Sequence, residues 1–131
     1  IKSVFKNLNN SVSASIVLFS TVAAQRGMPF HSSISAAKGG VEGLAKSLAA
    51  EFSPKIRVNV IAPSLVNTPL ANRFLNNDIK IEKSSQRHPL KRIGQPEDIS
   101  NFIEYLLSEK SSWMTGQIIS IDGGLSTIET N

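Results

Sequence analysis

The chain contains no cysteine, and this absence excludes several classes of site at once. Without cysteine there is no disulfide framework, no thiolate nucleophile and no cysteine-ligated metal. Two histidines, His31 and His88, are too few for a typical zinc site, so we expect no metal centre. No apolar stretch approaches the roughly 20 residues needed to cross a bilayer, so we expect no membrane partner. The sequence also shows no basic-then-apolar leader, which favours a cytoplasmic protein.

Aromatic residues are scarce as well, and their scarcity argues against nucleic-acid binding. The sequence has six Phe, one Tyr and one Trp, mostly in apolar contexts. The formal net charge is +4, but the densest basic group lies among acids in residues 80–92, which we expect to form a loop. Proteins that bind nucleic acid usually present a basic face, and those that bind single strands add aromatic platforms. We therefore expect no nucleic-acid partner.

The sequence does contain an alternation of helical and strand-like segments. Apolar residues at helical spacing predict a helix that ends near residue 10, another over about 32–52, and a third that begins at Pro96. A nearly unbroken apolar run predicts a strand over residues 14–19, and further strands are expected over residues 56–61 and 117–121. Strands separated by helices imply right-handed crossovers and a parallel sheet. The length of 131 residues suits one domain.

The pattern also predicts an irregular segment and the apolar face of the long helix. Residues 63–92 should be irregular, with one short helix near 70–75, and loops of this length are usually functional or mobile. The long helix should carry one apolar stripe. That stripe consists of Ile34, Ala37, Val41, Leu44, Leu48 and Phe52.

Four motifs follow one another along the chain. They are Ser20-Thr21 with residues 33–38, the turn Pro63–Thr68, the segment 94–99, and residues 115–124. Their order and spacing resemble those of the short-chain dehydrogenase/reductase family along essentially the whole chain. The resemblance implies an α/β fold, the C-terminal half of a Rossmann-type doubly wound parallel sheet with three strands alternating with helices. Residues 1–131 would form a single domain fragment, with the phosphate-binding half of the fold upstream of Ile1.

The resemblance also implies an activity. Family members transfer hydride between NAD or NADP and a carbonyl or secondary alcohol of a small-molecule substrate, and we expect a homodimer or homotetramer. In this chain Thr21 takes the family's serine position and Lys38 its lysine position, but Ile34 occupies the position of the catalytic tyrosine. Ile34 cannot transfer a proton, and a general acid typically contributes 10² to 10⁴-fold in rate. His31, three residues earlier, is a candidate substitute; alternatively it caps or precedes the helix and faces solvent.

The turn Pro63–Thr68 would lie beside the nicotinamide of NAD or NADP, while Lys38 would bind the ribose. The expected contacts in this turn are Pro63, Ser64, Val66 and Thr68. Ser64 replaces the family's glycine, so a positive φ at this position would be strained.

Residues 69–92 correspond to the family's substrate lid. Within this lid, His88 is interpreted as a solvated residue or a neighbour of the substrate. Two other functions remain open. Ile34 favours a non-catalytic homologue that binds a dinucleotide or a protein partner, and a purely structural fragment is the third alternative.

Overall fold

The computed structural model, which describes residues 1–129, contains one sheet of three parallel strands in the order β1–β2–β3. β1 spans Ala14–Phe19, β2 spans Ile56–Pro63, and β3 spans Ile118–Ile121. In the register, Leu18 lies opposite Val60 and Ile61 opposite Ile119. The parallel order and the alternation with helices confirm the predicted α/β class.

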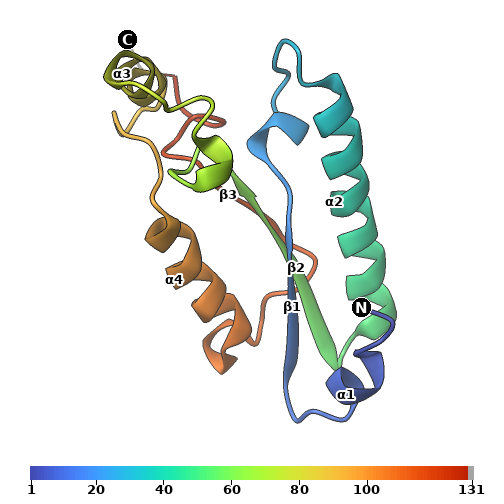
Figure 1. The fold of residues 1–131 in the computed structure, drawn as a ribbon. Coiled ribbons are helices and arrows are strands. Elements are labelled where there is room, and N and C mark those ends of the chain that lie inside the picture. Colours follow the sequence, from blue (N-terminus) through green and yellow to red (C-terminus); the bar gives the residue numbers. More distant parts are fainter. Residues whose placement is uncertain (130–131) are drawn as a thin grey trace.

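Helices cover both faces of this sheet (Figure 1). α1 spans Phe5–Asn9, α2 Ser32–Phe52, α3 Asp78–Gln86 and α4 Pro96–Leu107. Short 3-10 turns cover Val22–Ala24, Pro69–Ala71 and Glu109–Ser111. α2 connects β1 to β2 on one face, and α4 precedes β3 on the other. α3 lies near the carboxyl ends of the strands, beyond the edge of the sheet.

The core is built on β2, the central strand. Val58 and Val60 are fully buried and pack against Ala45 and Ala49 of α2. On the other face Ile61, also fully buried, packs with Ile99 and Leu106 of α4. Because both faces of this strand are covered, its alternating polar residues Arg57 and Asn59 are buried as well.

The predicted stripe of α2 is only partly correct. The fully buried residues of this helix are Ala45 and Ala49, and Leu48 and Phe52 pack beside them. Leu44, by contrast, is 50% exposed. The two alanines allow the helix backbone to lie close to the sheet, whereas the hydrophobic pattern gives most weight to the large side chains. The face of α2 that packs on the sheet is therefore rotated away from the predicted stripe.

The expectation that residues 63–92 would be irregular is wrong, because residues 78–86 form α3. Asn77 caps this helix, and its side chain accepts a hydrogen bond from the backbone N–H of Lys80 at 2.9 Å. Ile81 packs against a small cluster that contains Leu75 and Ile93. With so few apolar residues, the helix shows no stripe in the sequence. Within residues 1–129, no helix combines the length and apolar character needed to span a membrane.

Candidate functional site

The carboxyl ends of β1 and β2 open onto a cleft of ≈ 940 Å³. Parallel strands place their carboxyl ends on one edge of the sheet, which is where α/β folds commonly bind ligands. The cleft collects all the predicted site residues except Lys38. Among the residues that line it are Thr21, His31, Ile34, Pro63, Ser64, Val66 and Thr68.

Lys38 lies beside the cleft and does not line it. Its Nζ atom donates a hydrogen bond to the carbonyl oxygen of Phe19, at 3.0 Å, two residues before Thr21. Ser35 donates a hydrogen bond to the carbonyl oxygen of Ala23 at 2.6 Å and so fastens the first turn of α2 to the segment after β1. These contacts fix the start of α2 against the end of β1.

His31 is exposed at the N-cap position of α2, but its side chain does not cap the helix. Its Nδ1 atom lies 2.7 Å from the carbonyl oxygen of Pro29. Because a carbonyl oxygen can only accept, Nδ1 must carry the proton, which leaves the lone pair of the neutral ring on Nε2. The ring therefore precedes the helix and borders the same cleft as Thr21 and Ile34.

The turn after β2 is held in place by the segment that precedes α4. Val66 and Gly94 form a parallel bridge, in which Asn67 N–H donates to Gly94 O at 2.8 Å and Gly94 N–H to Leu65 O at 3.0 Å. A Cβ atom at Gly94 would lie only 3.3 Å from Val66 Cγ2, so a larger residue would push the turn away. Ser64 is not among the residues with positive φ, so the strain considered for this position is absent.

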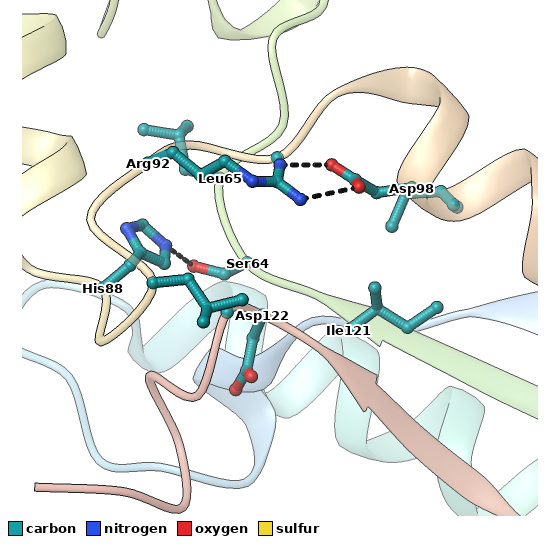
Figure 2. Close-up of a pocket in the computed structure, with 11 residues that line it drawn as sticks. Ser64, Leu65, His88, Arg92, Asp98, Ile121 and Asp122 are labelled. Atoms are coloured by element: carbon teal, nitrogen blue, oxygen red, sulfur yellow. Dashed lines mark hydrogen bonds and ion pairs between the residues drawn. The ribbon is translucent and has the colours of Figure 1, made fainter.

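His88 is 4% exposed, so the expectation of a solvated residue is wrong, while its place as a neighbour of the substrate stays a prediction. Its Nε2 atom lies 2.9 Å from Ser64 Oγ (Figure 2). Its Nδ1 atom lies 2.8 Å from the carbonyl oxygen of Ser84. Nδ1 therefore donates to Ser84, and in the neutral ring Nε2 accepts the hydroxyl proton of Ser64. Ser64 in place of the family's glycine was the one indication of the Ser64–His88 pair in the sequence. Nothing in the sequence indicated that its partner is a histidine 24 residues later.

Two carboxylates near this pair have lowered pKa values for different reasons. Asp98 and Arg92 form a two-pronged ion pair with oxygen–nitrogen distances of 2.6 and 2.8 Å. Arg92 and, secondly, the backbone N–H of Gln95 lower the pKa of Asp98 to about 2. Burial alone would raise the pKa of Asp122. Hydrogen bonds from Ser126 and Gly124, together with the charge of His88, have the larger opposite effect, so the pKa of Asp122 is lowered overall.

Comparison with known proteins identifies the family. A family model described as enoyl-(acyl carrier protein) reductase matches residues 1–126. The chain belongs to the short-chain dehydrogenase/reductase family. A tropinone reductase homolog from Datura stramonium is 40% identical over 121 residues, which are 89% of this chain and 45% of that protein. The chain spans about half the length of the curated relatives it matches.

Two further relatives have names that mention inactivity or an unusual catalytic centre. One is named inactive 2-(S)-hydroxypropyl-CoM dehydrogenase 2, from Xanthobacter autotrophicus, and is 39% identical over 86% of this chain and 51% of its own length. The other is a solved NADPH-bound short-chain oxidoreductase from Pseudomonas aeruginosa, described as containing an atypical catalytic center. It is 31% identical with a TM-score of 0.87, and the match covers 98% of this chain and 52% of that one.

Proposed function

We propose that the protein carrying this chain is an NAD(P)-dependent oxidoreductase that interconverts a carbonyl compound and a secondary alcohol. The observation that carries the proposal is the cleft at the carboxyl ends of β1 and β2. The cleft brings together the hydroxyl of Thr21 and the turn Pro63–Thr68, which come from separate segments of the chain. The chain also belongs to an oxidoreductase family. Thr21 would donate a hydrogen bond to the substrate oxygen.

The residues on this side of the cleft fit a nicotinamide ring. Among residues 1–129, the backbone N–H of Val66 has no hydrogen-bond partner, although the bridge to Gly94 holds this residue in place. That N–H and the hydroxyl of Thr68 would bind the carboxamide, with Pro63 and Ser64 beside the ring and Lys38 at the ribose hydroxyls. When bound, the nicotinamide supplies or accepts the hydride. To bind the ribose, Lys38 would have to break its hydrogen bond to the carbonyl oxygen of Phe19 or form both hydrogen bonds at once.

The proton is proposed to come from Ser64 and His88, since Ile34 has none to give. When His88 is protonated, its Nε2–H donates to Ser64 Oγ, and the hydroxyl proton of Ser64 turns toward the cleft. Ser64 then gives this proton to the substrate oxygen and receives the one on His88, so that the hydroxyl is regenerated. His31 is the other candidate, and within residues 1–129 its ring hydrogen-bonds the carbonyl oxygen of Pro29 and no side chain.

The second candidate function is a non-catalytic homologue that binds a dinucleotide or a protein partner. Ile34 lines the cleft where the family has its proton donor, and one relative with 39% identity is named inactive. The NADPH-bound relative with an atypical catalytic center shows that an unusual centre is compatible with cofactor binding in that protein. Turnover therefore decides between the two functions, and cofactor binding alone does not.

The test is NADH and NADPH oxidation by the protein that carries this chain, in the presence of a panel of ketones, aldehydes and keto acids. We expect slow oxidation that depends on the carbonyl compound and produces the matching alcohol. Cofactor binding without any alcohol product across the panel would favour the non-catalytic homologue. Absence of cofactor binding would contradict the oxidoreductase and leave only the homologue that binds a protein partner.

A further inference from the structure

A second cavity, of ≈ 480 Å³, adjoins the cleft and carries an unusual concentration of positive charge. Thr21, His31 and Ser64 line both spaces, so a molecule held in one can reach the other. The permanent cations that line the second cavity are Arg73, Lys80, Lys83 and Arg87. Within residues 1–129, no Asp or Glu lines it.

These four cations are not neutralised by neighbouring acids. Within residues 1–129, the one ion pair joins Arg92 to Asp98, outside this cavity. Glu82, an acid of α3, accepts a hydrogen bond from Gln86 at 2.7 Å and does not line the cavity. A cavity lined by charges of one sign focuses the electric field and raises the local concentration of counter-ions.

The arrangement of α3 explains how the charges are collected. Lys80, Lys83 and Arg87 are spaced by three and four residues, so they project from one side of the helix. The side chain of Ile81 packs into the cluster of Leu75 and Ile93, which fixes the rotation of the helix. We expected these basic residues to lie in a loop among acids. They instead lie along α3, which directs them to the cavity and keeps the acid Glu82 out of its lining.

Arg73 completes the cavity from the segment before α3. Its guanidinium carbon lies 4.6 Å from the centre of the Phe74 ring, and both side chains line the cleft as well as the second cavity. Stacking on an aromatic ring orients a guanidinium and leaves its edge N–H groups able to bind an oxyanion. Arginine pairs with carboxylates and phosphates through two parallel hydrogen bonds.

We propose that this cavity is an anion subsite, so that the substrates are carbonyl compounds that also carry a carboxylate or phosphate group. The oxyanion would lie among Arg73, Lys83 and Arg87, while the carbonyl group reaches Thr21 and Ser64. The carbonyl half of this statement rests on the proposed function. The anion half does not, because it follows from the charges that line the cavity.

Calorimetric titration without cofactor tests the subsite separately from turnover. The probes are levulinate and ethyl levulinate, which share one ketone and differ in a negative charge. We expect levulinate to bind at millimolar concentration or below, and more tightly than the ester by roughly tenfold to a hundredfold, as is typical for hydrogen bonds to charged groups. The double variant Lys83→Gln/Arg87→Gln should lose this preference. Both side chains are exposed, so the fold should persist, which circular dichroism can verify.

Lys110→Gln is the matched control, because Lys110 is exposed and lines neither cavity. It should keep the full preference for levulinate. Equal binding of acid and ester, no binding of levulinate, or a preference that survives in the double variant would overturn the proposal. Titration with inorganic phosphate shows whether a free anion competes with levulinate at this place, as we expect, and failure to compete would also contradict the subsite. If the preference is found but neither probe is reduced by NADPH, the subsite stands and the proposed oxidoreductase function loses support.

Discussion

The Nε2 atom of His88 lies 2.9 Å from Ser64 Oγ, and the Nδ1 atom of the same ring is held by the carbonyl oxygen of Ser84. The second contact fixes the ring, so that Nε2 faces the serine. The hydrogen bond between His88 and Ser64 joins the turn after β2, where the nicotinamide is proposed to bind, to the end of the lid segment, residues 69–92. The pair therefore connects the cofactor side of the cleft with the segment that would cover the substrate.

If this pair supplies the proton, Ser64→Ala and His88→Gln should each lower kcat for carbonyl reduction. The expected loss is about 10²- to 10⁴-fold, the usual contribution of a general acid. NADPH affinity, measured separately by fluorescence, should change little in Ser64→Ala. His31→Gln is the matched control, and a loss in this variant with normal kcat in the other two would make His31 the donor.

Ile34→Tyr should raise kcat, because it returns a hydroxyl to the family's position on α2, four residues before Lys38. Ile34 is 40% exposed and lines the cleft, so the larger ring has room. Steady-state kinetics with a keto acid measure the effect, and Ile34→Phe controls for ring size alone. Equal rates for the Tyr and Phe variants and the unmodified protein would show that the existing proton donor is sufficient.

Lys38→Ala should weaken NAD(P)H binding by roughly tenfold to a hundredfold, because it removes a charged hydrogen-bond donor proposed for the ribose. Calorimetry gives the dissociation constants. Lys46→Ala, on the exposed part of the same helix, is the control and should bind normally. Identical constants for Lys38→Ala and the unmodified protein would confine Lys38 to its structural bond with Phe19 O.

The long helix carries Gly39, Gly40 and Gly43. Apart from chain neighbours and the helix's own backbone, no heavy atom of residues 1–129 lies within 4 Å of a Cβ atom added to any of them. We propose that this open side of α2 pairs with its copy in a second subunit. Gly43→Glu should then weaken self-association, measured by sedimentation velocity, without unfolding the protein. Gly43→Ala is the control and should gain up to ~1 kcal/mol of helix stability. An unchanged oligomeric state in Gly43→Glu would place the interface elsewhere.

The ion pair of Arg92 and Asp98 predicts a dependence of stability on acid pH. The pKa of Asp98 falls from 3.8 to about 2 on folding, so its contribution is present above about pH 4 and is lost as the pH falls toward 2. In Arg92→Gln the pKa of Asp98 should move back toward 3.8, which NMR titration can follow. The difference in stability between the two proteins should shrink over the same interval. A pKa that stays near 2 in the variant would assign the effect to the Gln95 N–H.

The sequence predicted the parts of the fold that rest on local pattern. The apolar residues of the segment 56–61 indicated β2, and Pro96 with the following acids marked the start of α4. The convergence of Thr21 with the turn Pro63–Thr68 followed from the family motifs and the parallel strand order.

Other features depend on contacts that local pattern does not encode. α3 is a polar helix that is stabilised by a cap and one small cluster, so no apolar stripe announced it. His88 is buried by residues distant in the sequence, and Ser64 at a glycine position gave no indication of its partner. The cations of the second cavity also come together only once α3 is formed.

We propose, above all, that this cleft performs hydride transfer although Ile34 stands at the position that resembles the family's tyrosine. The most direct measurement uses NADPH labelled with deuterium at the transferable position, the unmodified protein that carries this chain, and a keto acid, with mass spectrometry of the product. We expect one deuterium in the alcohol carbon, at a rate that falls in Thr21→Ala. Bound NADPH with no labelled alcohol after prolonged incubation, across the panel of carbonyl compounds, would contradict the claim.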